Sequence, residues 1–412
     1  MVRVFLKKWI FLSIVIIFDL FIALRTSIEF FYFFFWFLIS VVTISLLWVV
    51  VLYLGTRLNL ERKTSSKIEQ DDILEIETVI ENKSFLPIFN FVLQDYLSCA
   101  IFQEREKSIL LEYLGPRSSL NIRYRCQCFL RGRYRIGPFS IYFFDPCGLF
   151  FLKKTYFIYS ELFVYPQTFN IQKFPPLIKG TVPWFGIETS RVSGDEHEFY
   201  GIREYRQGDP IKRIHWFSTA RQNKLIVKQF QRQSFFRATL IFNLEKDKNF
   251  GEGKESVVEY MVKIAASVSK YLIERDVSLE IIAHTGEIVH IPFNKGPEHL
   301  EDIFRFLAIA QAESSVNLNE IFEEFSRYIP SDSSLIVIML DTDWDCLPAM
   351  VSLEKRNVSL IPLILVSSSF LSLPVQQRTI KDIGIKLPRM ADFSPIFFFQ
   401  GDNLGEDFLK YE

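Results

Sequence analysis

The stretch WIFLSIVIIFDLFIALRTSIEFFYFFFWFLISVVTISLLWVVVLYL, residues 9–54, determines how the rest of the chain must be arranged. Trp9 to Leu24 contains one charged residue, Asp19, and Phe30 to Leu54 contains none. As helices, these segments of 16 and 25 residues would rise about 24 Å and about 37 Å, so each can cross the apolar part of a bilayer. The residues between them, centred on Arg25-Thr26-Ser27, are too few for a folded loop. The stretch therefore predicts a transmembrane helical hairpin with both ends on one side of the membrane.

Basic residues flank the outer ends of this hairpin, which is expected to span residues 1–57. Seven of them lie there: Arg3, Lys7, Lys8, Arg57, Arg62, Lys63 and Lys67. The turn contains Arg25 alone. Because segments rich in Lys and Arg stay on the cytoplasmic side, we expect a multi-pass protein of the inner, cytoplasmic membrane with both termini and all soluble domains in the cytoplasm. Asp19 lies within the first span, and we expect its carboxyl to be neutral or paired within an oligomer rather than to mark an ion path.

The composition of the 412 residues limits the class of protein. Lys and Arg (47) balance Asp and Glu (48), so no whole-chain charge favours nucleic acid. Hydrophobic residues make up 49%, whereas Gly and Pro number 17 each, which excludes a disordered or collagen-like chain. The five cysteines, without a C-x-x-C pair, predict reduced, mostly buried thiols. Cys126 and Cys128 lie two apart in an extended run, so they should share one face of a strand.

Residues 58–165 form short runs of alternating polar and apolar residues separated by turn signals. Examples are ILEIETVIEN (73–82), FNFVLQDYL (89–97) and NIRYRCQCFL (121–130). Turns are indicated at Gly137-Pro138 and Asp145-Pro146, because proline fixes φ. About one hundred residues with about seven strands predict an all-β, immunoglobulin-like sandwich. No catalytic constellation is recognisable there, so binding or spacing is the expected role.

Residues 166–234 combine a Pro-containing linker with a segment dense in charged and aromatic side chains. That segment, GDEHEFYGIREYRQGDPIKRIHWFSTARQNKLIVKQF, spans residues 194–230 and is called the hallmark segment below. Between Arg203 and Arg232 there are eight basic and two acidic residues, a local charge of +6 in a chain whose total is -1. The residues expected to carry its role are Arg203, Tyr205, Arg206, Gly208, Asp209, Arg213, Trp216, Arg221 and Lys228.

Two interpretations of the hallmark segment remain open. In the first it is an inter-domain scaffold in which Arg203 and Arg206 pair with nearby acids and Gly208-Asp209-Pro210 forms a turn. Arg213 and Trp216 would then hold the sandwich and the following domain together. In the second interpretation, surplus cations beside aromatic rings dock an acidic protein partner, anionic lipid or, less readily, nucleic acid.

The hallmark segment also resembles a known family. Its fixed positions are Gly201, Arg203, Tyr205, Gly208, Asp209, Arg213, Ile214, Trp216, Ala220, Arg221, Leu225, Val227 and Lys228. This set is similar to that of the bacterial proteins catalogued as domain of unknown function 58 (DUF58). The elements RGRYRIGP, DPCGLF and VYPQ and the two-helix N-terminus resemble that family too. The resemblance implies a membrane-anchored protein with a von Willebrand factor A-like domain, often encoded beside a MoxR-type AAA+ ATPase, and it supplies no established activity.

Residues 235–391 alternate between apolar strands and helical stretches. Strands are expected at 238–244, 277–284, 334–341 and 358–366, and helices at 255–275, 297–312, 318–328 and 347–356. Buried strands separated by helices predict an α/β, doubly wound, mostly parallel sheet, which the resemblance implies is von Willebrand A-like. Residues 392–412 are expected to form a C-terminal tail. Ligands of such sheets bind at the C-terminal ends of the strands.

A von Willebrand A-like domain would hold a metal at those strand ends through a D-x-S-x-S loop. Here the first loop reads Asn243-x-Glu245-x-Asp247, and Asp341 follows a later strand. Oxygen ligands suited to Mg²⁺ or Ca²⁺ remain, but Asn replaces the leading Asp and acids replace both serines. We therefore expect no cofactor, and a degenerate site with at best millimolar affinity for divalent cations. Zinc is not expected either, since His197 and His215 lack a third ligand in register.

No phosphate-loop, dinucleotide-binding or hydrolase-elbow motif occurs in the sequence. The expected function is that of a non-enzymatic, membrane-anchored cytoplasmic scaffold or adaptor that recruits protein partners. The resemblance suggests that it works with a MoxR-type AAA+ ATPase in complex assembly or metal insertion. The alternatives are a metal-dependent hydrolase at the strand ends, with Asp341 essential, and anionic-lipid or nucleic-acid binding by the hallmark segment.

Overall fold

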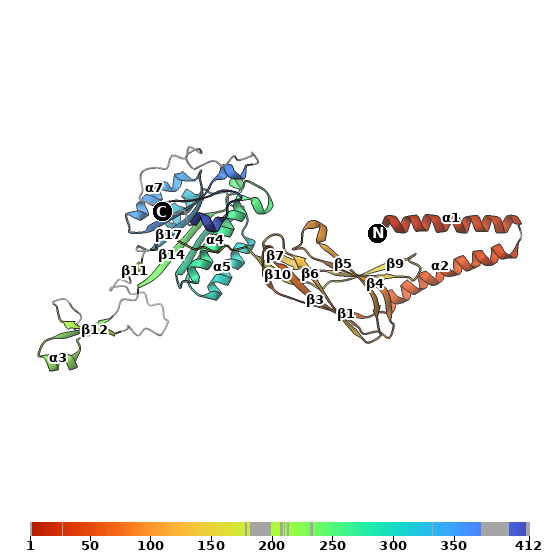
Figure 1. Ribbon diagram of the computed structural model, residues 1–412, viewed down its shortest axis with the longest axis horizontal. Coiled ribbons are helices and arrows are strands. Elements are labelled where there is room, and N and C mark those ends of the chain that lie inside the picture. The colour runs from red at the N-terminus through yellow and green to blue at the C-terminus, as the bar shows by residue number, and fades with distance from the viewer. Residues whose placement is uncertain are drawn as a thin grey trace. The chain divides into compact units, whose positions relative to one another are not determined.

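The computed structural model describes residues 2–26, 28–177, 179–181, 199–206, 209, 211, 214–230, 234–331, 333–371 and 395–408. The chain divides into two compact units, Met1–Gln167 and Thr168–Glu412. In Figure 1 the first unit runs from red to yellow and the second from yellow-green to blue. Each unit is a separate packing problem with its own core.

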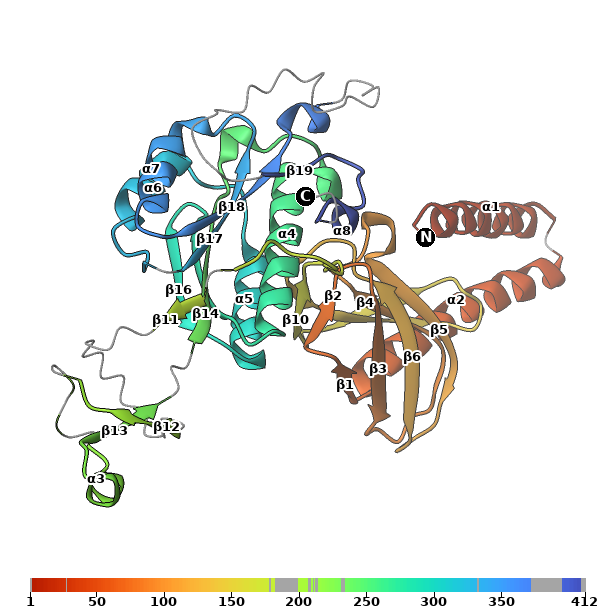
Figure 2. The same ribbon diagram turned by 60° about the vertical axis from the view of Figure 1, so that its left-hand side comes forward.

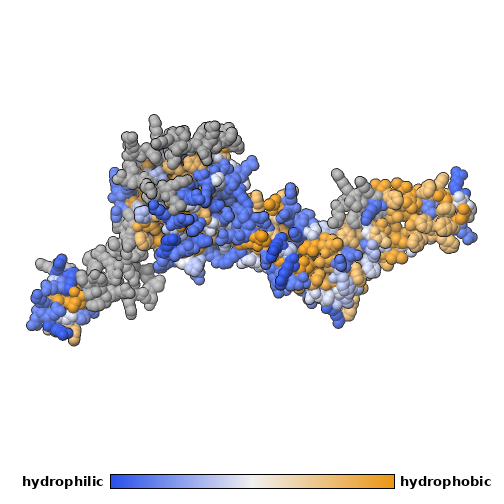
Figure 3. Space-filling view, viewed as in Figure 1, coloured by the Kyte–Doolittle hydropathy of each residue, from blue (hydrophilic) through white to orange (hydrophobic). Residues whose placement is uncertain are grey.

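Two long helices begin the first unit, α1 (Val2–Thr26) and α2 (Glu29–Gly55). Both are long and apolar enough to cross a membrane, over Lys8–Thr26 and Glu29–Gly55, so the two candidate spans agree with the expected hairpin. Most of their large apolar side chains are exposed, which gives the hydrophobic surface of this region in Figure 3. Asp19, Ala23 and Ser45 are buried, because the helices pack against each other.

The strands of residues 58–165, called the β region below, form three sheets. The first has the order β1-β3-β6, with β1 (Leu58–Thr64), β3 (Ile73–Asn82) and β6 (Ser119–Gln127). The second has the order β5-β4-β8-β9, with β5 (Glu106–Leu114), β4 (Ile88–Tyr96), β8 (Phe139–Phe144) and β9 (Phe151–Tyr156). The third has the order β2-β10-β7, with β2 (Lys67–Glu69), β10 (Ser160–Tyr165) and β7 (Gly132–Ile136). The expectation of a strand-rich region is thus confirmed. The sequence pattern of residues 58–165 did not predict that β2 and β10 pair in parallel.

The core of the β region follows from the two-residue period of its strands. On β3, Ile76 and Ile80 are buried while Glu75 faces out. Side chains of the first two sheets share one cluster, so these sheets pack face to face. Cys126 and Cys128 are both buried in a second cluster, as their spacing predicts.

A charged pair lies inside this core. Arg62 of β1 forms an ion pair with Asp95 of β4, and both side chains are almost fully buried. The Tyr124 hydroxyl donates to the same carboxylate, and the Arg62 guanidinium lies 4.1 Å from the centre of the Phe139 ring. The pair links β1 of the first sheet to β4 of the second, and removing one member would leave the other charge buried and uncompensated. Arg62 was counted above among the flanking cations, but its side chain lies inside the β region.

The second unit is built on a seven-stranded sheet. Five strands are parallel: β14 (Ser234–Asn243), β15 (Ser278–His284), β17 (Ser334–Leu340), β18 (Ser359–Leu365) and β19 (Ile396–Phe398). The antiparallel ones are β16 (Ile288–Asn294), beside β15, and β11 (Lys179–Thr181), beside β14. The helices are α4 (Val257–Ile273), α5 (Pro297–Ile309), α6 (Leu318–Phe325), α7 (Leu347–Glu354) and the short α8 (Leu404–Asp407). Figure 2 shows α4 and α5 on one face of the sheet and α6 and α7 on the other.

The four expected strands and four expected helices of this unit all occur close to their expected positions. Three strands of the sheet were missed, and one of them, β11, is three residues long and lies in the expected linker. β16 alternates exposed and half-buried residues at the sheet edge, and its pattern is too weak to separate it from a loop. β19 is three residues long and pairs with β18, so part of the expected tail, 392–412, belongs to the sheet. A strand this short carries no periodicity of its own.

Candidate interaction surface

The hallmark segment folds as a β-hairpin with a short helix in its loop. The strands β12 (Phe199–Glu204) and β13 (Ile226–Phe230) are antiparallel, and α3 (Trp216–Gln222) lies between them in sequence. Ile214, Ile226 and Val227 are buried and give the hairpin a small core of its own. The segment is therefore a folded element, whose charged residues are held in place by backbone structure.

Arg203 closes the turn that follows β12. Its guanidinium binds both carboxylate oxygens of Asp209, at 2.6 Å and 2.7 Å. The Arg206 amide donates to the same carboxylate at 2.9 Å. The hydrogen bonds from Arg203 and then from Arg206 lower the pKa of Asp209 to about 2. The expected pairing of Arg203 with a nearby acid is thus present, and Asp209 is the acid.

His215 begins helix α3. Its Nδ1 atom accepts from the Ser218 amide at 3.3 Å and lies 2.7 Å from the Ser218 hydroxyl, so the imidazole caps the helix. The Thr219 hydroxyl accepts from the Ile226 amide at 3.0 Å and ties the helix to β13. His215 therefore has a structural role.

The outer surface of this element combines aromatic rings with cations. Trp216 is 64% exposed and Phe217 is 75% exposed. Phe217 and Arg221 are four residues apart on α3 and share one face of the helix, and the side chain of Arg206 is also exposed. Arg221 has no ion-pair partner among the described residues. A cationic helix with uncovered rings is suited to contact a partner that offers carboxylates and apolar surface.

The other expected residues of the segment have mixed outcomes. Trp216 is 64% exposed within the part of the chain that the structure describes, and the expectation that it fills an apolar gap between the two domains stays a prediction. Tyr205 and Lys228 are half-buried, and the Tyr205 amide donates to the Leu225 carbonyl at 2.8 Å. Gly208 and Arg213 lie outside the described residues, so the interpretation that depends on Arg213 is untested.

The expected metal ligands lie at the C-terminal ends of β14 and β17, but they do not converge on one point. Asn243 donates through Nδ2 to the Val316 carbonyl at 2.7 Å, and Asp341 accepts from the Ser367 amide at 2.9 Å. Asp247 is exposed. Among the described residues, no three His, Cys, Asp or Glu side chains gather as ligands for one ion. The set does not fit a von Willebrand-type metal centre.

One lysine pairs with two acids at these strand ends. Lys248 Nζ lies 2.8 Å from Glu245 Oε2 and 2.7 Å from Asp343 Oδ1. Burial alone would lower the pKa of Lys248, but hydrogen bonds and attraction from Asp343 and Glu245 raise it above its ordinary value. The second Asp343 oxygen accepts from the Leu340 amide at 3.0 Å. An internal ammonium ion thus occupies a position between carboxylates, a role that the sequence pattern did not reveal because Lys248 lies outside the expected loop motif.

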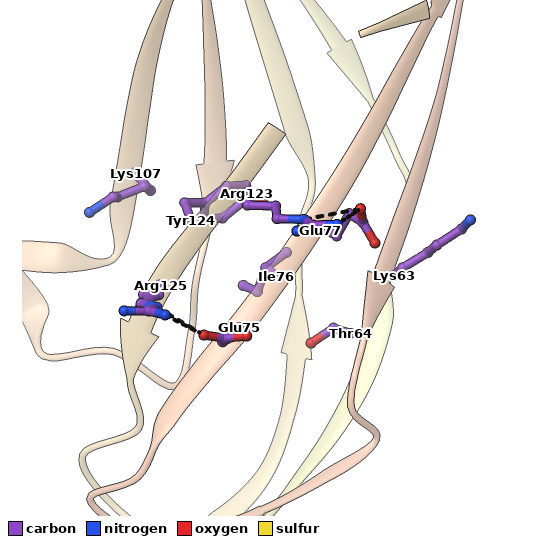
Figure 4. Close-up of a pocket in the computed structure, with 9 residues that line it drawn as sticks. All are labelled: Lys63, Thr64, Glu75, Ile76, Glu77, Lys107, Arg123, Tyr124 and Arg125. Atoms are coloured by element: carbon purple, nitrogen blue, oxygen red, sulfur yellow. Dashed lines mark hydrogen bonds and ion pairs between the residues drawn. The ribbon is translucent and has the colours of Figure 1, made fainter. Parts of the chain in front are cut away.

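A broad recess of about 860 Å³ lies on the outer face of the first sheet of the β region (Figure 4). Its acids are already paired, Glu75 with Arg125 and Glu77 with Arg123. A hydrogen bond from Asn121, followed by one from Arg123, lowers the pKa of Glu77. Because these side chains are largely solvated, the recess is an ion-paired face of the sheet.

The chain thus combines two candidate membrane helices, a β region and a mostly parallel α/β unit that displays a basic, aromatic hairpin. The family model described as "Protein of unknown function DUF58" matches residues 201–374, so the resemblance seen in the hallmark segment is confirmed over this range. "Uncharacterized protein YeaD" of Bacillus subtilis (strain 168) is 22% identical over 257 residues. That alignment covers 61% of this chain and 61% of the relative, so the chain spans less than two thirds of it.

Solved structures add only distant likenesses. The CARDB domain of PF1109 from Pyrococcus furiosus is 16% identical with a TM-score of 0.20, covering 27% of this chain and 94% of that one. Proximal thread matrix protein 1 from the mussel byssus is 11% identical with a TM-score of 0.26, covering 32% and 38%. Scores this low carry no functional argument.

Proposed function

We propose that this protein is a non-enzymatic, membrane-anchored adaptor whose hallmark segment docks an acidic surface of a protein partner. The observation that carries the proposal is the uncovered pair Trp216 and Phe217 beside Arg221, on a hairpin that has its own buried core. Aromatic side chains bury a large area on binding and lose little conformational entropy. With a cation beside them, they are the usual anchors of protein interfaces. The +6 charge between Arg203 and Arg232 selects acidic partners.

The anchoring is proposed to be in the cytoplasmic membrane, with the β region immunoglobulin-like, the second unit von Willebrand A-like and both in the cytoplasm. The two candidate spans and the six flanking cations other than the buried Arg62 support this topology. The partner proposed from the family resemblance is a MoxR-type AAA+ ATPase, acting with this chain in complex assembly or metal insertion. An adaptor role needs no cofactor.

The hydrolase alternative has less support. Glu245 and Asp343 are both paired with the Lys248 ammonium group. A general base or metal ligand needs a lone pair directed at a substrate or ion, and in these two acids an oxygen is directed at Lys248 instead. Anionic lipid and RNA remain competitors for the hallmark surface, and the experiment below distinguishes them.

The test uses the full chain in its native membrane. A photo-crosslinking analogue, p-benzoylphenylalanine, replaces Phe217, and a second variant carries it at Tyr328, which is 77% exposed in the same unit. We expect the Phe217 position to crosslink an AAA+ ATPase subunit and the Tyr328 position not to do so. Arg221→Glu should lower the yield by about tenfold, the effect of about 1.4 kcal/mol in affinity.

The matched control is Lys355→Glu, which reverses an exposed cation elsewhere in the second unit. It should leave the yield unchanged. Crosslinks that lead only to lipid or RNA would assign the surface to those ligands and overturn the adaptor proposal. Equal yields from the Phe217 and Tyr328 positions would overturn it as well.

A further inference from the structure

The last turns of α2 belong to the β region. Val49 and Leu52 are almost fully buried, in the same cluster as Leu60 and Phe91 of the strands. After α2 ends at Gly55, β1 begins at Leu58, so helix and strand are joined without a linker. The β region therefore covers one side of the last turns of α2, while Val51 and Leu54 on another side of the helix stay exposed.

Several contacts fix the β region to the outer ends of both helices. Lys154 Nζ donates to the carbonyls of Tyr53 at 3.2 Å and Thr56 at 2.9 Å, and so caps the C-terminus of α2. Burial lowers the pKa of Lys154. On α1, Trp9 Nε1 donates to the Leu149 carbonyl at 2.9 Å. The helices therefore do not act as a flexible tether.

The strand pairings show which loops lie at the helix end of the β region. Leu58, where α2 passes into β1, is paired with Asn82 at the end of β3. Ile88, at the start of β4, is paired with Leu114 at the end of β5. The β3–β4 loop (83–87) and the β5–β6 loop (115–118) are therefore at the end from which the helices leave. Leu86 lies so close to Gly55 that a Cβ there would be 2.6 Å from the Leu86 Cδ1 atom.

These two loops carry an exposed ring and a cation in contact. Phe85 is 75% exposed, and the Arg117 guanidinium lies 4.2 Å from the centre of its ring. The exposed cations at this end are Lys8, Arg57, Lys83 and Arg117, and Lys83 pairs loosely with Glu81 at 3.5 Å. Aromatic rings with Lys and Arg beside them are typical of the level of lipid headgroups.

We propose that the β region is seated on the bilayer, with Phe85 inserted at the level of the headgroups and Arg117, Lys83 and Arg57 bound to anionic phospholipid. The proposal rests on the proposed membrane anchoring, because the helices bring this end of the β region to the surface. Because the helices already hold the chain at the membrane, the contact between the β region and lipid is in effect intramolecular. A small contact surface on the β region is therefore enough. The cations give the seat its preference for phosphatidylglycerol over zwitterionic lipid.

The test measures depth in the bilayer at four positions of the full chain, each labelled in a separate variant. Cys147, the exposed cysteine of the described residues, is first changed to Ser, and the chain is reconstituted into vesicles of phosphatidylethanolamine and phosphatidylglycerol. Spin labels are attached at Phe85→Cys, Phe102→Cys and Leu47→Cys in separate variants. Phe102 is the matched control: it is 81% exposed with Arg105 at 5.6 Å, and it lies beyond the Tyr96–Glu106 pair at the opposite end.

We expect the Leu47 label to be accessible to oxygen and shielded from a water-soluble nickel chelate, because 62% of Leu47 is exposed on the candidate span. The Phe85 label should have at most about a third of the nickel accessibility of the Phe102 label. A label at Lys83→Cys, with Phe85 retained, should show the same shielding if the Phe85 variant misfolds. In pure phosphatidylcholine the shielding at both loop positions should weaken by about half or more.

Three results would count against the proposals, and each has a different consequence. If Leu47 is shielded while Phe85 and Lys83 are as accessible as Phe102, the seat does not exist and the anchoring stands. If Leu47 itself is open to the nickel chelate, the anchoring proposal fails and the seat fails with it. Shielding that is equal in anionic and zwitterionic vesicles would retain the ring insertion but overturn the phospholipid charge preference.

Discussion

Lys248 determines what the C-terminal ends of β14 and β17 can bind. Its ammonium ion pairs with Glu245 and Asp343, so a divalent cation would have to displace an internal charge. We predict that the native chain binds Mg²⁺, Mn²⁺ and Ca²⁺ no more tightly than about 1 mM. Lys248→Met should strengthen Mn²⁺ binding by about tenfold, which isothermal titration calorimetry would detect. Lys246→Met is the control, because it removes the same charge from an exposed neighbour; equal changes in both variants would contradict this account.

Trp216 offers a second test at the level of one residue. Because 64% of it is exposed, Trp216→Ala should change the free energy of unfolding by less than about 1 kcal/mol. A packed ring costs about 3–5 kcal/mol on truncation, and Phe242, fully buried in β14, supplies that comparison. Thermal unfolding of the two variants beside the native chain measures the difference. A loss at Trp216 as large as that at Phe242 would support the interpretation in which Trp216 is packed between the domains.

Among the elements, the hairpin of the hallmark segment should lose stability in acid. Arg203 and the Arg206 amide lower the pKa of Asp209 to about 2 from its ordinary value near 4, so the carboxylate form favours the folded hairpin. This stabilisation is present above about pH 4 and is lost as the pH falls towards 2. Fluorine NMR of fluorotryptophan at Trp216 should report a transition in that window. Asp209→Asn should remove the pH dependence, and a transition that persists in this variant would refute the assignment.

Helix α2 should behave as one element with two environments. Leu52 is 3% exposed within the core of the β region, whereas Leu54 in the same turn is 73% exposed. We expect Leu52→Ala to lower the stability of the β region by about 2–5 kcal/mol and Leu54→Ala by under about 1 kcal/mol. Thermal unfolding in detergent micelles compares the two. Equal effects would mean that the end of α2 is not part of that core.

How far the sequence predicts each element depends on whether its signal is local. The candidate spans and the strands of the second unit can be predicted from local sequence, because runs such as Ser334–Leu340 are almost continuously apolar. The role of Leu52 is not visible in this way, since a residue buried in a protein core and one facing lipid are equally apolar. Lys248 is likewise invisible, because its partner Asp343 is distant in sequence. Such contacts arise from tertiary packing, which no window of residues contains.

At the scale of the whole molecule, two independent features report on which side of the membrane the β region lies. Positive charge around the hairpin predicts the cytoplasm. The sulfur atoms of Cys99 and Cys126 provide an internal reporter, because they lie only 3.9 Å apart and could join with a small shift. An exported domain would carry that disulfide, whereas a cytoplasmic one stays reduced.

We therefore predict that chains taken from native membranes and alkylated without reductant carry five free thiols. In a Cys147→Ser background, a cysteine at the exposed position Ser65 should stay unmodified by an impermeant maleimide in intact cells and react after lysis. The lysed sample controls for accessibility, since Ser65 lies beside β1 and outside the core. Labelling of Ser65→Cys in intact cells, together with a Cys99–Cys126 disulfide, would reverse the topology. It would also remove a cytoplasmic ATPase from the candidate partners. The hallmark segment follows the β region without a further candidate span among the described residues, so both would then lie outside the cytoplasm, where that ATPase cannot reach them.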